Sequence, residues 1–124
     1  MNNPRITKKE HGLLKGALRR VFSRSELRNS VVKASLVEHL DPNRPRVKKW
    51  CLCNICRKPE AKSYVVVDHI NPVIPVHTSF EAMSLDEVVD RLWCAINNLQ
   101  VVCSSCHDEK TKQERKDRKA KRTK

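Results

Sequence analysis

The 124-residue chain is long enough for one domain with a modest hydrophobic core, because 39% of its residues are hydrophobic and only 4% are aromatic. No apolar run approaches the roughly 18 residues of a transmembrane helix, and the first residues, MNNPRITKKEHG, lack the apolar segment of a secretory signal. We therefore expect no membrane partner and an intracellular location. The net charge of +12 is unevenly divided, since residues 1–50 carry +9, residues 51–109 carry −4 and residues 110–124 carry +7; basic flanks suited to a phosphate backbone enclose an acidic centre that could hold a cation.

Two amphipathic helices are predicted at the N-terminus. Residues 8–21 follow the capping-box pattern Thr7-Lys8-Lys9-Glu10 and carry apolar residues at helical spacing. The same pattern in Ser23-Arg24-Ser25-Glu26 predicts a second helix to about Leu40, before the break at Pro42. Its apolar stripe would comprise Leu27, Val31, Ala34 and either Val37 or Leu40. This basic helical hairpin, residues 1–49, suits direct contact with DNA and a scaffold with a solvated charged face equally well.

The middle of the chain predicts a loop, a strand and a short helix. Residues 46–62 are expected to form a loop that carries the first cysteines. The β-branched residues of 63–70 (SYVVVDHI) predict a strand, which ends before Pro72. Ser84-Leu85-Asp86-Glu87 is a third capping pattern and predicts a helix to about Trp93.

A second strand and a basic helix are predicted to complete an α+β fold. Residues 98–103 (NLQVVC) predict the strand, and helix-forming residues from Ser104 to about Arg118 predict the helix. The core would then span residues 50–115, followed by a basic C-terminal tail at residues 116–124.

Four of the six cysteines have the spacing of a structural zinc site. They form two C-x2-C pairs, separated by 46 residues: Cys53 with Cys56, and Cys103 with Cys106. A C-x2-C turn brings two thiolates to one side of a tight loop, so two turns complete a tetrahedral S4 site. A disulfide framework or buried apolar thiols are weaker interpretations for a chain expected in a reducing compartment. Cys51 could compete as a ligand, whereas Cys94 is expected to fill the core.

Polar residues gather around the cysteine pairs. Asp68 and His69 end an apolar strand. Burying an adjacent acid and imidazole there costs free energy, so we expect these two residues to have a functional role. Neighbours on a strand point to opposite faces, although a twist at the strand end could direct both toward a common cation and water. His107 directly follows a cysteine at the start of the last helix, where the helix N-terminus adds positive potential. The remaining histidines, His11, His39 and His77, are interpreted as surface or helix residues.

The strings VVVDHINPV and NNLQVVCSSCHDEKT resemble the HNH nucleases, and most closely the cysteine-containing HNH proteins of bacteria and their viruses. The resemblance covers about residues 50–115 and implies a small ββα-metal core with a structural zinc site, in the cytoplasm of a bacterium or a phage-infected host. It implies that His69 is the general base, that Asn98 is the middle asparagine and that His107 is the final histidine. Asn97 is an alternative to Asn98, but the NLQ register favours the latter.

The resemblance also implies the metals. Asp68 and His107 would ligate a catalytic divalent cation (Mg²⁺, Mn²⁺ or Ni²⁺), and the four paired cysteines would bind structural Zn²⁺. The chain departs from shorter relatives in residues 71–96, a long linker that lacks the expected glycines.

The residues suit phosphodiester hydrolysis without reference to a family. Histidine is the usual general base at neutral pH, so His69 is suited to take a proton from water, and a hard cation held by Asp68 and His107 would polarise the phosphate. Asn98 would hydrogen-bond to the loop after the strand and fix the orientation of His69. Candidate phosphate contacts on the last helix are Lys110, Lys112 and Arg115. For Lys110, about one turn after His107, a solvated helix face is nearly as good an interpretation.

The sequence thus predicts a metal-dependent HNH endonuclease that acts on DNA, expected to be double-stranded. A monomer would nick one strand, and a weak dimer could cut both. The alternative is a non-catalytic, zinc-stabilised DNA-binding module, in which the polar residues only support the zinc site. A third interpretation, an accessory that binds a protein partner, is disfavoured by the charge pattern.

Overall fold

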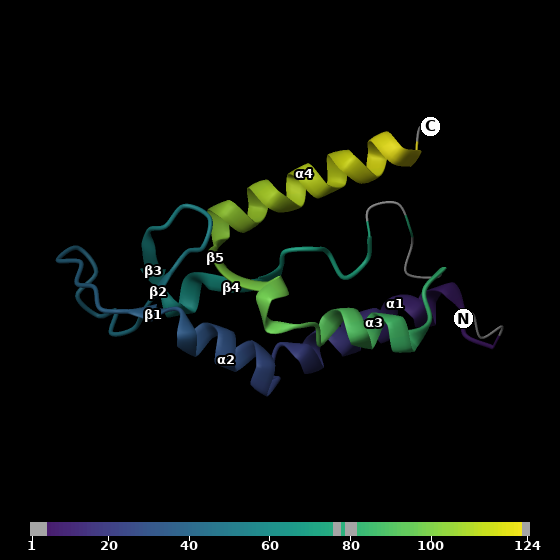
Figure 1. Ribbon diagram of the computed structural model, residues 1–124, viewed down its shortest axis with the longest axis horizontal. Helices are drawn as coiled ribbons and strands as arrows, with labels where there is room; N and C mark the ends of the chain where they lie inside the picture. Colours follow the sequence, from purple (N-terminus) through teal and green to yellow (C-terminus); the bar gives the residue numbers. More distant parts are fainter. Residues whose placement is uncertain (1–4, 76–77, 79–81, 123–124) are drawn as a thin grey trace.

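The computed structural model describes residues 5–75, 78 and 82–122. Within these residues the fold is α+β, with four α-helices, a three-stranded antiparallel sheet of order β1-β2-β3 and a two-stranded antiparallel sheet of β4 and β5 (Figure 1). The elements in chain order are α1 (Lys8–Phe22), α2 (Glu26–Ala34), β1 (Leu36–Val37), β2 (Trp50–Leu52), β3 (Pro59–Ala61), the 3-10 helix η1 (Lys62–Tyr64), β4 (Val65–His69), α3 (Leu85–Leu92), the 3-10 helix η3 (Ile96–Asn98), β5 (Leu99–Cys103) and α4 (Ser104–Arg122). Among the described helices, none combines the length and the apolar character needed to cross a membrane.

The predicted caps of α1 and α3 are confirmed, whereas the cap of α2 lies two residues later than predicted. The Thr7 hydroxyl accepts a hydrogen bond from the Glu10 N–H, and the Glu10 carboxylate accepts one from the Thr7 N–H. Ser84 likewise accepts from the Glu87 N–H. Ser23 instead ends α1, and Ser25 is the N-cap of α2. Ser23 and Ser25 are two positions apart and both are suitable caps, and in the structure the Ser25 hydroxyl accepts from the Arg28 N–H.

The second helix is shorter than its sequence predicts. It ends at Ala34, because the next residues pair with β2 as the strand β1, with Leu36 opposite Cys51 and Val37 opposite Trp50. Strand pairing outweighs helix propensity here. Leu40 is 90% exposed and belongs to no apolar stripe. The predicted loop at residues 46–62 is wrong for the same reason, since it contains β2 and β3, strands of three residues that are too short to show a period.

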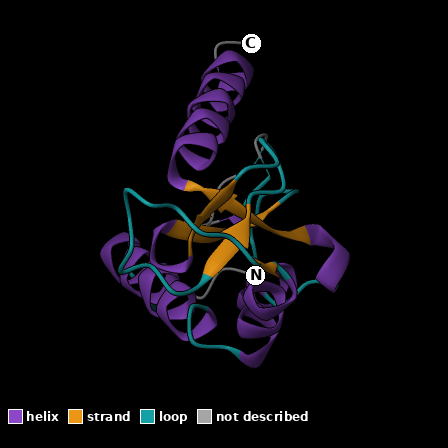
Figure 2. Ribbon diagram, turned by 90° about the vertical axis from the view of Figure 1, so that its left-hand side faces the viewer, coloured by secondary structure: helices purple, strands orange, loops and turns teal. Residues whose placement is uncertain are grey.

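The antiparallel pair of β4 and β5, which we call the β4–β5 hairpin although a long segment with α3 connects its strands, is the centre of the fold. Its strands pair in register from Val65 opposite Cys103 to His69 opposite Leu99, and α4 begins directly after β5. Figures 1 and 2 show the hairpin between α4 on one side and α1, α2 and α3 on the other. The helix α2 packs on β4 and β5, and α1 packs on α3.

The N-terminal helices share one hydrophobic core with the rest of the chain. Val31 and Val32 of α2 are buried in the same cluster as Leu99 and Val101 of β5. Phe22, at the end of α1, meets the edge of Trp93 with a centroid distance of 5.3 Å. The basic N-terminal helices α1 and α2 therefore contribute apolar side chains to the core beside the β4–β5 hairpin.

We predict that Phe22→Ala lowers the free energy of unfolding by about 3–5 kcal/mol, because the truncation leaves a cavity against Trp93. Leu13→Ala on the same helix should change it by less than about 0.5 kcal/mol, since Leu13 is 62% exposed. Urea unfolding monitored by circular dichroism measures both, and equal losses for the two variants would contradict the packing described.

Candidate functional site

The four paired cysteines come together as predicted. Their Sγ atoms all lie within 4.8 Å of one another, compared with about 3.8 Å for sulfurs at about 2.3 Å from one tetrahedral zinc ion. Four thiolate donors with this spacing fit a metal ion such as zinc. Neither Cys51, which is fully buried, nor Cys94, which packs against the core, belongs to this cluster.

Two different turns place the cysteines. Cys53 follows β2, and the loop after it closes through Arg57, whose N–H donates to the Cys53 carbonyl at 3.0 Å. Arg57 adopts a φ of 62°, a left-handed conformation that costs a non-glycine residue about 1–2 kcal/mol. The second pair spans the junction between β5 and the first turn of α4. Occupation of the cluster would therefore join the β2–β3 turn to the strand-helix junction.

The surroundings of the cysteines favour the thiolate form of Cys53 over that of Cys106. Burial opposes its ionisation, but hydrogen bonds from the backbone N–H groups of Cys103, Cys56 and Ile55 outweigh this and lower the Cys53 pKa to about 6. Hydrogen bonding to Cys103 is the largest of the effects that raise the Cys106 pKa to about 12. One thiolate is thus favoured at neutral pH, and a bound divalent cation would displace the remaining thiol protons.

We predict that Cys106→Ser reduces the zinc content from about one ion per chain to well below one, because three thiolates form an incomplete site. Cys94→Ser, which removes a thiol outside the cluster, should retain the metal. Metal analysis of the purified variants measures both, and a zinc-free wild-type chain that stays folded would contradict the assignment.

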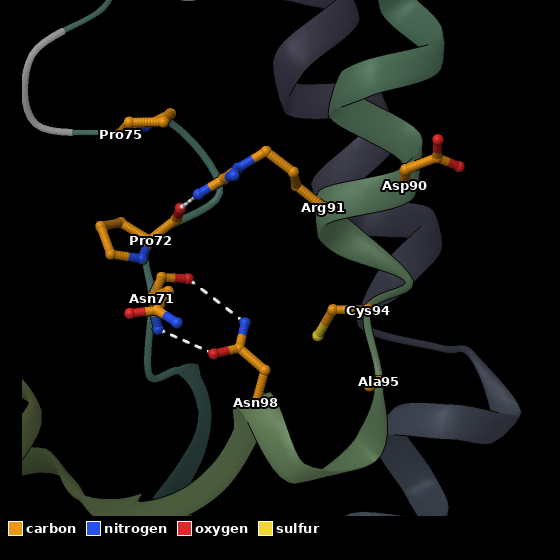
Figure 3. A pocket seen from close by; sticks show the side chains of 8 residues that line it. All are labelled: Asn71, Pro72, Pro75, Asp90, Arg91, Cys94, Ala95 and Asn98. Atoms are coloured by element: carbon orange, nitrogen blue, oxygen red, sulfur yellow. Dashed lines mark hydrogen bonds between the residues drawn. The ribbon is translucent and has the colours of Figure 1, made fainter.

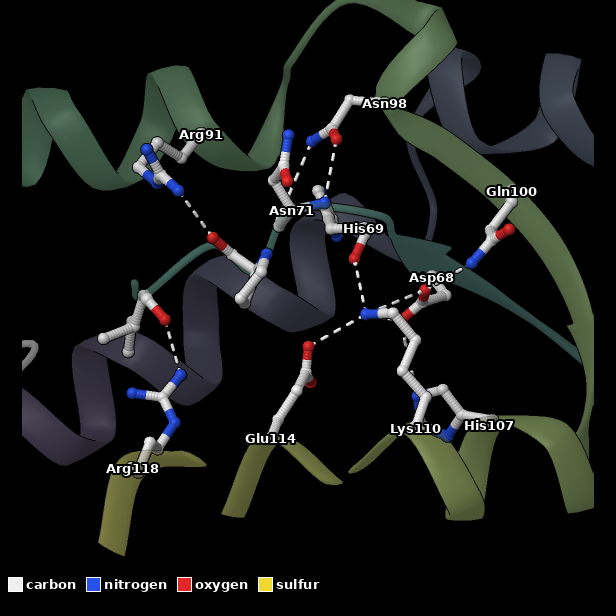
Figure 4. Close-up of polar contacts among 12 residues, drawn as sticks. Asp68, His69, Asn71, Arg91, Asn98, Gln100, His107, Lys110, Glu114 and Arg118 are labelled. Carbon is white, nitrogen blue, oxygen red and sulfur yellow. Dashed lines mark hydrogen bonds and ion pairs between the residues drawn. The ribbon is translucent and has the colours of Figure 1, made fainter. Parts of the chain in front are cut away.

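Asp68 is the acidic centre of a second polar site (Figure 4). It lies on β4 with 8% of its surface exposed. Its Oδ2 atom accepts a hydrogen bond from Gln100 Nε2 at 2.9 Å, across the hairpin. His107 Nε2, in the first turns of α4, lies 4.0 Å from Oδ1. The predicted pair of cation ligands is therefore brought together.

Lys110 places its ammonium group in this acidic centre. Its Nζ atom lies 3.2 Å from Asp68 Oδ2, 3.1 Å from the His69 carbonyl oxygen and 2.9 Å from Glu114 Oε2. Burial alone would lower the Lys110 pKa, but the hydrogen bond to Glu114 and the charge of Asp68 outweigh it and raise the pKa above its ordinary value. The Lys110 side chain is only 20% exposed, so it is no solvated helix face. Its predicted phosphate contact would require the ammonium to leave this shell of oxygen atoms.

His69 points away from Asp68, as neighbours on a strand do. Its Nε2 atom lies 2.8 Å from the Leu92 carbonyl oxygen, and its ring lies 5.0 Å from the Phe22 ring. A carbonyl can only accept, so Nε2 carries the hydrogen and Nδ1 is the nitrogen that can take a proton. No twist at the strand end turns both side chains to one centre; instead the His69 carbonyl oxygen faces Lys110.

Asn98 makes the predicted contact with the loop after β4. Its Oδ1 atom accepts from the Asn71 N–H at 2.9 Å, and its Nδ2 donates to the Asn71 carbonyl at 3.4 Å. The Asn98 carbonyl also accepts from the Ile70 N–H at 2.8 Å. Asn98 thus holds the turn that directly follows His69.

A pocket of about 610 Å³ adjoins this turn (Figure 3). Its lining includes Asn71 and Asn98 at the turn, Asp90 on α3, and Cys94 just after that helix. Arg91 of α3 donates to the carbonyls of Pro72 and Val73 at 2.7 and 2.6 Å, and so fixes the loop that forms the rim.

Other predicted and unpredicted residues complete the description. Lys112 and Arg115 are exposed on α4, with Lys112 Nζ 3.9 Å from Glu109, and His77 lies outside the described residues. The sequence prediction missed Gln100 and Glu114 as parts of the site. A polar residue inside the apolar run of β5, and a carboxylate four residues after Lys110, were the available signals.

Comparisons with protein-family models, with curated proteins and with solved structures found no match for this chain.

Proposed function

We propose that this chain is a metal-dependent endonuclease of the HNH type that hydrolyses phosphodiester bonds of double-stranded DNA. One observation carries the proposal: Asp68 and His107 face each other across the junction of β4, β5 and α4, beside oxygen atoms that already surround a cationic group. The order strand, strand, helix and the identities of these residues agree with the ββα-metal core that the sequence resembles.

The residues fit a divalent cation. In an octahedral site with bonds of about 2.1 Å, two opposite ligands lie about 4.2 Å apart, close to the 4.0 Å that separates Asp68 Oδ1 from His107 Nε2. A carboxylate and an imidazole suit Mg²⁺, Mn²⁺ or Ni²⁺. Lys110 would move from Asp68 toward Glu114, which is already its nearest partner. When bound, the cation would polarise the scissile phosphate and stabilise the leaving oxygen.

His69 would take the proton from the attacking water. In an in-line displacement the water and the leaving oxygen lie on opposite sides of the phosphorus, so a base on the face of β4 opposite the cation ligands is compatible with this role. The Leu92 carbonyl holds its Nε2–H, which leaves Nδ1 as the base and stabilises the imidazolium that forms. Asn98 holds the turn after β4 and thereby the position of the imidazole ring. Phe22 packs against that ring, with the two ring centroids 5.0 Å apart.

The basic face of α4 would contact the DNA backbone through Lys112 and Arg115. Both side chains are exposed, and they lie one to two turns beyond His107 on the same rigid helix. Each phosphate neutralised by such a side chain releases counterions. A monomer has one such site and would cut one strand, and a weak dimer would be needed to cut both.

We predict that His69→Ala reduces plasmid nicking by about 10²–10⁴-fold in the presence of Mg²⁺, Mn²⁺ or Ni²⁺, because the general base is lost. His39→Ala removes an exposed imidazole that contacts the Trp50 ring instead, so it should cut at the wild-type rate. Undiminished cutting by His69→Ala would show that another group is the base.

A second candidate function is a zinc-stabilised DNA-binding module without catalysis. The favouring observation is that Lys110 already neutralises Asp68, so the carboxylate has a counter-charge without a metal. A wild-type chain that binds DNA but cuts with none of the three metals would favour this alternative.

Under either function, we predict that the double variant Lys112→Ala/Arg115→Ala weakens DNA binding and lowers the slope of log K against log salt by about 2, because each lost cation removes about one phosphate contact. The charge-preserving double variant Lys112→Arg/Arg115→Lys should keep the wild-type slope. Fluorescence anisotropy at several salt concentrations measures both, and an unchanged slope in the alanine variant would place the DNA elsewhere.

A further inference from the structure

A chain of hydrogen bonds joins the first cysteine turn to Asp68. Asn54 lies between Cys53 and Cys56, and its Nδ2 atom donates to Gln100 Oε1 at 2.8 Å. Gln100 Nε2 then donates to Asp68 Oδ2 at 2.9 Å, and Figure 4 shows Gln100 reaching from β5 toward the carboxylate. Gln100 is only 8% exposed, so both ends of its amide need partners. The two bonds supply them.

These hydrogen bonds all run in one direction. Arg57 Nη1 donates to Asn54 Oδ1 at 3.2 Å, Asn54 donates to Gln100, and Gln100 donates to Asp68. A flipped Gln100 amide would put its oxygen against the carboxylate and its NH₂ against that of Asn54, so neither bond could form. The orientation of each amide is therefore determined by its neighbours, and each bond polarises the next toward the carboxylate.

Backbone hydrogen bonds fix the positions of Asn54 and Asp68, the two ends of this series of hydrogen bonds. The Asn54 N–H donates to the Val101 carbonyl at 2.8 Å, which attaches the cysteine turn to β5. Gln100 and Asp68 are directly opposite in the β4–β5 register. A shift of the cysteine turn along β5 would therefore break the contact between Asn54 and Gln100.

The hydrogen bond from Gln100 also determines which oxygen of Asp68 faces His107. Oδ2 accepts from Gln100, while Oδ1 is the atom nearest His107 Nε2. Without the amide, the carboxylate could rotate about its Cβ–Cγ bond. Hydrogen-bonded partners of this kind orient metal-ligating carboxylates and raise their affinity.

We propose that Gln100 and Asn54 are positioning residues that couple cation binding at Asp68 to metal occupancy of the cysteine cluster. The inference rests on the proposed function, in which Asp68 is a cation ligand. A metal held by Cys53 and Cys56 fixes Asn54 between its two ligands, and the amides pass that constraint to Asp68. Because coupling of binding free energies is reciprocal, a cation at Asp68 also strengthens metal retention by the cysteines.

The test is a Mn²⁺ titration of the zinc-loaded chain followed by electron paramagnetic resonance, with Asp68→Asn defining the signal that belongs to this site. Gln100→Met keeps the length of the side chain without its hydrogen bonds and should weaken Mn²⁺ binding about 10–100-fold. Asn54→Ala, an exposed position, should weaken it less, and the double variant should match Gln100→Met alone. Gln113→Met, which makes the same change at an exposed position on α4, should bind as wild type does.

The outcomes are distinct. Wild-type affinity in both Gln100→Met and Asn54→Ala, each with one zinc per chain, would overturn this inference and leave the proposed function standing. A wild-type chain that binds no Mn²⁺ at Asp68 would overturn both. If Gln100→Met does not fold, Asn54→Ala decides, and a loss of Mn²⁺ affinity with full zinc content and unchanged thermal unfolding supports positioning over general stability.

Discussion

The position of α4 depends on the burial of the Asp68 charge. An ionised carboxylate with 8% of its surface exposed costs several kcal/mol unless it is paired and hydrogen-bonded. Gln100 supplies one bond from the same hairpin, but the counter-charge must come from Lys110, one turn along α4 from His107. The helix must therefore cross the hairpin at the height of Asp68, which brings His107 to the same carboxylate.

Two further attachments keep α4 in this place. The cysteine cluster joins its first turn to the loop after β2. Near its other end, Arg118 donates to the carbonyls of Ile74 and Pro75, in the loop after β4. Three attachments spread along one helix resist both sliding and rotation. A chain with few aromatic residues thus obtains a defined polar site without a large hydrophobic core.

The local signals were predictable from the sequence, and the long-range ones were only partly so. The caps at Thr7 and Ser84 and the meeting of the four cysteines follow from short patterns. So does β4, although the strand predicted over residues 63–70 is shorter in the structure, where η1 occupies Lys62–Tyr64. The strand β1 could not be predicted, because its two residues become a strand only by pairing with β2 residues that are 13 and 15 positions away. The same limit applies to Lys110. Its spacing from His107 places it near the site, but only the assembled fold shows that its ammonium faces Asp68 and not solvent.

The loop after β4 contains Pro72 and Pro75, so groups from other elements must hold its position. Proline has no N–H, so this segment cannot be held by a regular ladder of backbone bonds. Its carbonyls are held instead by Arg91 from α3 and Arg118 from α4. Guanidinium groups keep their charge at every pH a cell reaches. The loop that borders the site is therefore held by donors whose charge does not depend on the acidity of the surroundings, and its position depends on α3 and α4 together.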